Sequence, residues 1–558
     1  MARRHPAFGG IGGAVCSCSF IRSPPSKRWS RGRLYRRWGH LNEVAPLGTS
    51  RVGDRTAKTW CLCRTGVEPE ASSAILLSPG GMSYNAEEAS LSARGTRVSG
   101  SRGILDQGFS MYLQDAYHRE NNPQGILNVG TSENKLCFDL LQEKLSSSGM
   151  NYLEPSLFQY CEVNGIKRFR EEIANFLTEY GKALKPLSPD NIVIMNGCSS
   201  IFSALATVLC DPGDGYLIPT PYYGSVNTQT ELYGRIQPVH VPLFSETCNK
   251  DEHSFELTVN KLEMAMQRAK EQGIRVRALI LINPHNPLGD TYPAQLLKEC
   301  LYFGHRHELH VIVDEIYMFS VYDDSSFTSV LSIEDLPDPQ RTHFMWGFSK
   351  DFAMAGVRVG VLHTQNQQVC RAVTKLASFH QCAAPIQYVL SQMLSDRDWL
   401  DNVFFPTNKR RLREAQNILV NGLNEIGIPV HRSSGGLFVW ADFRKFLKTQ
   451  TFESELELWW ALIEEKLYIS PGQAFYSYEP GWFRLVFSDS MDNIKLCIER
   501  LQKVLQRDTF GFSQGMTSSI ENELASVNSE DKDSDTEMNL LSESSVATYL
   551  QMEKIVVH

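Results

Sequence analysis

Lys350 is the side chain whose surroundings most favour covalent chemistry. It follows an apolar, β-rich run, and Arg358 comes eight residues later in the segment SKDFAMAGVRVG (349–360). A lysine of ordinary pKa, about 10.4, is protonated at neutral pH, so an amine that bonds to a carbonyl needs a cationic or desolvated neighbourhood. Arg358 could supply that charge and, with the Ser349 hydroxyl, could bind a phosphate dianion. Most Ser-Lys pairs in loops are solvated surface, so this prediction depends on the rest of the chain.

Other polar groups follow runs that are predicted to be strands. The apolar runs lie at 192–195, 277–282 and 309–313. They alternate with helical patterns, which predicts a mainly parallel sheet covered on both faces. The polar groups that follow them are Ser199, Asn286 and Asp314. Because ligands of such sheets bind beyond the carboxyl ends of the strands, we expect these groups to share a site.

The stretch Asn196-Gly-Cys-Ser-Ser200 joins a predicted strand to an apolar helix. This geometry points backbone N–H groups and the positive helix end at an anion. The alternative, that Gly197 only makes a tight turn, has equal weight at this point.

A second α/β unit is predicted after residue 431. It contains the strand 482–487, and Arg484 lies inside this apolar run. A buried arginine must be paired, either with structural carboxylates or with the carboxylate of a ligand.

Composition limits the class of protein. With 558 residues and 42% hydrophobic content, the chain can bury one large core or two medium ones. The net charge of -8 disfavours nucleic-acid binding, and no apolar run is long enough to span a membrane. The thirteen cysteines lack the paired spacing of a zinc site, so we expect reduced thiols and a cytoplasmic protein. Residues 1–60 are basic, and a mitochondrial transit peptide is the alternative to disorder there.

Several motifs together make a family resemblance. They are GTSENKLCFDL (130–140), PTPYY (219–223), NPHNPLG (283–289), DEIY (314–317), SKDFAMAGVRVG (349–360) and GWFRLVFSD (481–489). The sequence resembles the fold-type I, class I aminotransferases, which depend on pyridoxal 5'-phosphate. Within them it is most similar to the 1-aminocyclopropane-1-carboxylate synthases, in particular the animal synthase-like branch. The resemblance covers roughly residues 101–508.

The resemblance implies an α/β fold of the PLP-dependent transferase fold type I. Its mainly parallel seven-stranded sheet would be covered by helices, beside a smaller α/β C-terminal domain. The implied divisions are a disordered basic extension (1–100), an N-terminal arm and part of the small domain (101–185), the large cofactor-binding domain (186–395), the small domain (396–508) and a disordered acidic tail (509–558).

The resemblance also implies roles at the cofactor ring. Lys350 would form the Schiff base with the cofactor aldehyde, and Asp314 would face the pyridine nitrogen and keep it protonated. Asn286 and Tyr317 would hydrogen-bond the ring 3-oxygen. Tyr223 would stack on the ring face.

Further roles are implied at the phosphate and the substrate. The amides of Cys198 and Ser199 and the side chains of Ser199, Ser349 and Arg358 would hold the phosphate. Tyr160 would reach the phosphate of a neighbouring subunit, which implies a homodimer with shared sites. Arg484 would bind the substrate α-carboxylate, and Glu133 matches a synthase position near the substrate.

One position departs from the family pattern. Members commonly carry Ser or Thr three residues before the lysine as a phosphate ligand, but this chain has Gly347. Loss of one hydrogen bond to a charged group, about 1.5 to 3 kcal/mol, would weaken cofactor binding roughly ten- to a hundredfold. Cys198 and Ser199 replace a small-Thr pair, which we interpret as a mild change.

The implied function is an enzyme of amino-acid metabolism that acts at Cα of a small amino-acid substrate through an external aldimine. Transamination or deamination is favoured at least as much as synthase chemistry, because the cofactor supplies the reactivity and the pocket selects the bond. The alternative is a cofactor-binding pseudoenzyme or interaction protein without turnover.

Overall fold

The computed structural model describes most of the chain. The described residues are 91–100, 103–150, 152–246, 253–322 and 327–507. Residues 1–90 of the predicted basic extension and the predicted acidic tail 509–558 therefore lie outside the described residues, and helix α1 (Ala93–Gly100) occupies the end of that extension. Within the described ranges, no helix combines the length and apolar character needed to cross a membrane.

A seven-stranded sheet carries the candidate site, in the order β2-β8-β7-β6-β5-β3-β4. Its strands are β2 (Ile192–Met195), β3 (Gly215–Thr220), β4 (Gln237–Pro242), β5 (Val276–Ile282), β6 (His310–Asp314), β7 (Thr342–Gly347) and β8 (Gly360–Thr364). Only β8 runs antiparallel to its neighbours. The predicted mainly parallel seven-stranded sheet of an α/β protein is confirmed.

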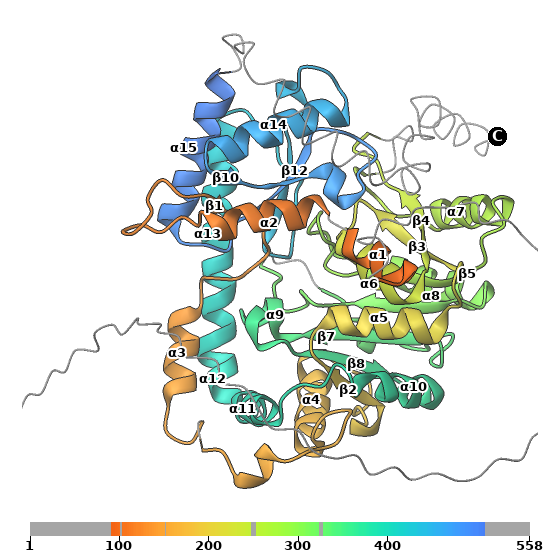
Figure 1. Cartoon of the computed structure of the whole chain (residues 1–558). Coiled ribbons are helices and arrows are strands. Elements are labelled where there is room, and N and C mark those ends of the chain that lie inside the picture. Colours follow the sequence, from red (N-terminus) through yellow and green to blue (C-terminus); the bar gives the residue numbers. More distant parts are fainter. Residues whose placement is uncertain (1–90, 101–102, 151, 247–252, 323–326, 508–558) are drawn as a thin grey trace, which may run out of the picture. The chain divides into compact units, whose positions relative to one another are not determined.

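Helices cover both faces of this sheet (Figure 1). They are α4 (Lys167–Tyr180), α5 (Cys198–Leu209), α6 (Ser225–Gly234), α7 (Val259–Glu271), α8 (Ala294–Arg306), α10 (Gln367–Ala377) and α11 (Ala384–Ser395). Alternate residues of β5 belong to different cores: Leu279 and Leu281 pack on one face, Ile280 and Ile282 on the other. A strand buried on both sides needs the continuous apolar run that the sequence has there.

The C-terminal part forms a separate, three-stranded antiparallel sheet. Its strands are β9 (Phe438–Asp442), β11 (Ser470–Pro471) and β12 (Trp482–Val486), in the order β11-β12-β9. The helices of the C-terminal part are α12 (Arg397–Trp399), α13 (Phe405–Glu425), α14 (Phe452–Glu464) and α15 (Met491–Arg507).

An N-terminal segment completes this C-terminal unit. Strand β1 (Leu127–Asn128) pairs in parallel with β10 (Leu467–Tyr468), although more than three hundred residues separate them. Helix α2 (Ile104–Gln114) precedes β1, and α3 (Phe138–Ser146) follows it. The Tyr468 hydroxyl donates to the Leu105 carbonyl at 3.1 Å, so α2 is also held against β10.

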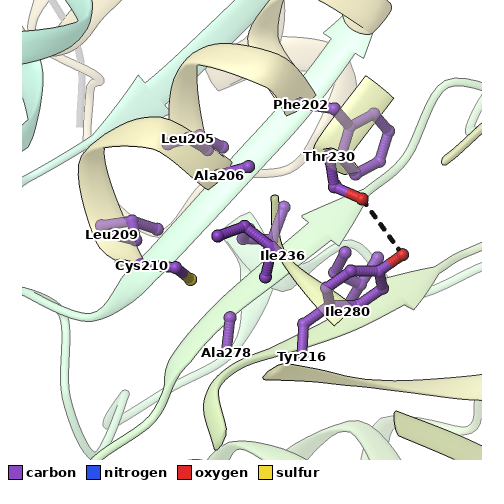
Figure 2. Close-up of a pocket in the computed structure, with 11 residues that line it drawn as sticks. Phe202, Leu205, Ala206, Leu209, Cys210, Tyr216, Thr230, Ile236, Ala278 and Ile280 are labelled. Carbon is purple, nitrogen blue, oxygen red and sulfur yellow. Dashed lines mark hydrogen bonds between the residues drawn. The ribbon is translucent and has the colours of Figure 1, made fainter. Parts of the chain in front are cut away.

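The apolar core between α5 and the sheet contains one small cavity (Figure 2). Its volume is about 10 Å³, too little for more than a single water molecule. Aliphatic side chains such as Leu205 and Ile280 line it, and its polar groups bond to each other: the Thr230 hydroxyl lies 3.2 Å from the Tyr216 hydroxyl. This cavity is a packing gap in the core and not a ligand site.

Candidate active site

Lys350 lies on α9 (Phe348–Asp351), the short helix that begins where β7 ends. Its Nζ donates a hydrogen bond to the backbone carbonyl of Ser132. Burial of the ammonium, and next the charge of Arg484, lower the pKa of Lys350 from 10.5 to about 8. At pH 7 such an amine is neutral in about one molecule in ten, far more often than an ordinary lysine. The side chain is therefore tuned towards a nucleophile or base.

Asp314 lies at the end of β6, beside the lysine's strand, and is almost fully buried. Burial raises the pKa of Asp314 to about 7, although a hydrogen bond from the Ile316 amide at 3.2 Å and the charge of Lys350 favour the ionised form. A buried carboxyl in this state gains from any cation placed against it. The arrangement fits a protonated ring nitrogen.

The neighbouring Glu315 has a different, structural environment. It is fully buried, and it accepts hydrogen bonds from the Ser329 hydroxyl at 2.5 Å and the Val330 amide at 2.7 Å. Burial raises the pKa of Glu315 to about 8. Because protein groups already satisfy its oxygens, Glu315 anchors the loop and is not a candidate for ligand binding.

The first turn of α5 and Arg358 together make a candidate anion site. Gly197 caps this helix with φ of 114°, and a Cβ there would come within 2.5 Å of Nη2 of Arg358. Glycine thus provides both the left-handed backbone and the room for the guanidinium at the helix start. The Ser199 hydroxyl accepts from Gln229 at 3.0 Å in the same turn. The backbone amides of a helix start, a helix dipole and an arginine together suit a phosphate.

Gly347 and Cys198 fit against each other at this anion site. A Cβ at position 347 would lie 2.6 Å from the Val359 carbonyl oxygen and 3.2 Å from Sγ of Cys198. The thiol itself donates to the Trp346 carbonyl at 3.3 Å, and burial keeps the pKa of Cys198 well above its ordinary value. The space that a side chain at 347 would need is therefore filled by a neutral thiol and a strand. The interpretation of Cys198 as a mild change leaves out this contact.

Arg484 lies inside β12 and is buried. Its Nη1 donates to Oδ1 of Asn286 at 3.0 Å, its Nη2 donates to the Gly130 carbonyl at 2.6 Å, and its Nε has no hydrogen-bond partner in the described residues. The guanidinium lies 5.1 Å from the ring of Phe438 and 4.7 Å from that of Phe475. No carboxylate of the described residues forms an ion pair with it. Such a buried cation suits the carboxylate of a ligand.

Two tyrosines lie near these groups. The Tyr317 hydroxyl is 3.1 Å from the Ser132 hydroxyl, and its ring packs edge-on against Phe438 with 5.4 Å between centroids. Tyr223 is half-buried, and its phenol interacts electrostatically with Arg484 and Tyr317. The charges of Lys350, Arg358 and Asp314 also act on one thiol, that of Cys198. The structure thus brings both predicted ends of the cofactor site to one place.

The remaining predicted residues lie less centrally. Glu133 is half-buried, and its charge acts on Lys350, where it favours the protonated amine. Ser349, next to the lysine, is also half-buried. Tyr160 is fully exposed at 106%, so its side chain is not brought to the site of its own chain.

Sequence reasoning missed Ser132. Its carbonyl accepts from Lys350, and its hydroxyl contacts Tyr317. The residue lies within the motif GTSENKLCFDL, but a serine between Thr131 and Glu133 has no pattern that indicates such contacts.

A family model described as aminotransferase class I and II matches residues 127–501. The chain belongs to this family. Pyridoxal 5'-phosphate is the cofactor of class I and II aminotransferases, and the half-buried Lys350, the buried Asp314 and the candidate anion site at α5 fit its aldehyde, ring nitrogen and phosphate.

Curated relatives of this aminotransferase-family chain are similar over most of its length. It is 49% identical to "1-aminocyclopropane-1-carboxylate synthase-like protein 1" of Homo sapiens, over 74% of this chain and 83% of that protein. It is 45% identical to "Probable inactive 1-aminocyclopropane-1-carboxylate synthase-like protein 2" of Homo sapiens, over 75% of this chain and 73% of that protein. Among solved structures, an aspartate aminotransferase from Thermus thermophilus with maleate matches 74% of this chain and 99% of its own, with a TM-score of 0.60 and 20% identity. This last likeness shows the shared fold.

Proposed function

We propose that the protein is a pyridoxal 5'-phosphate enzyme that acts at Cα of a small amino acid. The observation that carries the proposal is the pairing of a lysine amine, whose pKa is about 8, with a buried arginine that has no anionic partner in the described residues. An amino acid presents both an α-amino group and a carboxylate, which are the groups that this pair can engage.

The side chains divide the work. When bound, pyridoxal 5'-phosphate supplies an aldehyde and an electron-accepting ring. Arg484 binds the α-carboxylate through its guanidinium. On binding, Nη2 of Arg484 gives up its hydrogen bond to the Gly130 carbonyl and donates to the carboxylate instead. This contact orients the substrate so that Nζ of Lys350, as a neutral amine, takes the proton from Cα. Asp314 would stabilise positive charge on the cofactor ring.

The reaction type is open between two classes that share these residues. The name of the relative at 49% identity supports synthase chemistry, while the class I and II family supports transamination or deamination. Purified protein would be incubated with S-adenosylmethionine, or with an amino acid and a 2-oxo acid, and the products identified. Formation of a new amino acid without aminocyclopropane would assign transamination, and the converse would assign the synthase reaction.

Cofactor binding is tested by absorbance. We expect a visible band from the purified protein, lost in Lys350→Ala, and a spectral change when an amino acid is added. Gly356→Ser is a matched control, since a Cβ there meets no atom within 4 Å. A protein that shows no band when saturated with cofactor would refute the proposal.

A second candidate is a cofactor-binding protein without turnover. The missing side chain at Gly347 and the relative named "Probable inactive" support it. It predicts a visible band that no amino acid perturbs, whereas the enzyme predicts a perturbed band. The same absorbance experiment therefore separates the two candidates.

The homodimer with shared sites is also part of this proposal. Its support is a run of exposed aromatic side chains: Tyr152 at 69%, Phe158 at 70% and Tyr160 at 106%. Light scattering should give twice the chain mass, and Tyr160→Ala should weaken cofactor binding; a monomer of wild-type affinity would contradict both.

Free thiols such as Cys300 and Cys497 support a cytoplasmic location, which imaging of the tagged full chain can check.

A further inference from the structure

The four-residue segment Gly130–Glu133, which we call the strap, contacts several predicted site residues at once. The Gly130 carbonyl accepts from Arg484, and the Ser132 carbonyl accepts from Lys350. The Ser132 hydroxyl lies 3.1 Å from the hydroxyl of Tyr317. One short segment therefore bonds to the side chains proposed for carboxylate binding, for proton transfer and for the ring oxygen.

The strap is fixed in place from both sides. Oδ1 of Asn128 accepts from the amides of Gly130 at 3.1 Å and Thr131 at 2.9 Å, and its Nδ2 donates to the Thr131 hydroxyl at 3.0 Å. At the other end, the Ser488 hydroxyl donates to the Glu133 carbonyl at 2.7 Å. Ser132 is itself buried, with 5% exposure. A hydroxyl held this firmly can position its partner.

We propose that Ser132 is a positioning residue that acts through Tyr317: its hydroxyl donates to the phenol oxygen and leaves the phenol proton for the ligand. A phenol has a single proton. If Tyr317 donates it to a ligand oxygen, the bond between Tyr317 and Ser132 must have the serine as donor. This inference rests on the proposed function and adds a residue to its site.

The consequence concerns the strength of the tyrosine as a donor. A hydrogen bond accepted by the phenol oxygen favours removal of its proton, and the Ser132 contact lowers the otherwise raised pKa of Tyr317. A more acidic phenol is a stronger donor to the oxygen of a bound ring. Removing the serine hydroxyl should therefore weaken the hydrogen bond from Tyr317 to the ring oxygen. The effect should be smaller than in Tyr317→Phe, which removes that hydrogen bond completely.

The test is a double-mutant cycle read from the cofactor's visible absorption band as pH is varied. Ser132→Ala should raise the pH midpoint of the band by about half a unit, the effect of one modest hydrogen bond. Tyr317→Phe should raise it further, and Ser132→Ala added to Tyr317→Phe should give no additional shift. Ser132→Thr, which keeps the hydroxyl, should restore most of the wild-type midpoint.

Two further measurements separate positioning from mere loosening. Thr131→Val removes another hydroxyl of the strap, one that faces Asn128, and should leave the midpoint unchanged. In the cofactor-free protein, Ser132→Ala and Tyr317→Phe should be non-additive in melting temperature, because each removes the same hydrogen bond.

The outcomes are distinct. A wild-type protein without a band overturns the proposed function and this inference together. A normal wild-type band with additive shifts in the cycle, or an equal shift in Thr131→Val, overturns only the role of Ser132.

Discussion

Replacing Gly347 by serine tests how the anion site is built. The family pattern alone suggests that a hydroxyl at this position adds a phosphate ligand and tightens cofactor binding. The structure predicts the opposite, because a Cβ would lie 2.6 Å from the Val359 carbonyl oxygen. Optimal contacts between nonbonded carbon atoms are about 3.5 to 4.0 Å, so one of the two groups must move.

The size of the effect follows from what would have to move. The Val359 carbonyl already accepts from the Phe348 amide at 3.2 Å, and a shift of that carbonyl weakens this bond, worth about 0.5 to 1.5 kcal/mol. The Cys198 thiol, 3.2 Å from the new Cβ, must also move. Overpacking of this kind usually costs about 1 to 3 kcal/mol, and we expect Gly347→Ser near the upper end. Backbone strain adds nothing, since φ at Gly347 is -176°.

The assay is thermal unfolding of the cofactor-free protein, followed by a cofactor titration. Gly356→Ser is the matched control, because a Cβ there meets no atom within 4 Å. We expect a lower melting temperature than the control's and no gain in cofactor affinity. If Gly347→Ser melts with the control and binds the cofactor tenfold more tightly, the steric reasoning is wrong and the position is an ordinary vacant ligand site.

Four other results are expected. Arg484→Gln should lower kcat/KM for the substrate by roughly a hundredfold or more, because two charge-assisted bonds of about 1.5 to 3 kcal/mol each lose their charge; an unchanged value would remove the arginine from carboxylate binding. Asp314→Asn should keep the cofactor bound but abolish turnover, which kinetics at saturating cofactor would show. An amine reagent should label Lys350 in cofactor-free protein with a midpoint near pH 8, because the neutral form reacts and its pKa is lowered from 10.5 to about 8. Because the pKa of Lys350 is lower in the folded than in the unfolded chain, the free energy of unfolding should rise as pH rises from about 8 to 10.5. Lys350→Met should lose this pH dependence.

The polar residues at the ends of the strands could be predicted, because their positions follow from short stretches of sequence. Asp314 ends the apolar strand β6, Lys350 comes three residues after the end of β7, and parallel strands bring their carboxyl ends together. The mainly parallel sheet followed from the same alternation of apolar runs, whereas its seven strands were implied by the family resemblance. Family motifs then gave Arg484 its expected role, which neither burial nor spacing alone could distinguish from a structural ion pair.

Contacts through the backbone were not predictable. The bond from Lys350 to the Ser132 carbonyl joins residues 218 positions apart, and any residue type could offer that carbonyl. The pairing of β1 with β10 was equally hidden, since two residues per strand carry no periodic signal. At Gly347 the sequence indicated a missing hydrogen bond, whereas the close approach of Val359 and Cys198 depends on three-dimensional packing.

The pairing of β1 with β10 has a consequence for the order of assembly during synthesis. The strap follows closely after β1 in the sequence. Strand β1 can pair with β10 only after residues 467–468 have been synthesised, and Arg484 is synthesised later still. A ribosome-bound chain that ends after the seven-stranded sheet therefore has Lys350 and the strap, but lacks both β10 and Arg484. Competence to hold a substrate is acquired only when nearly the whole described chain has emerged.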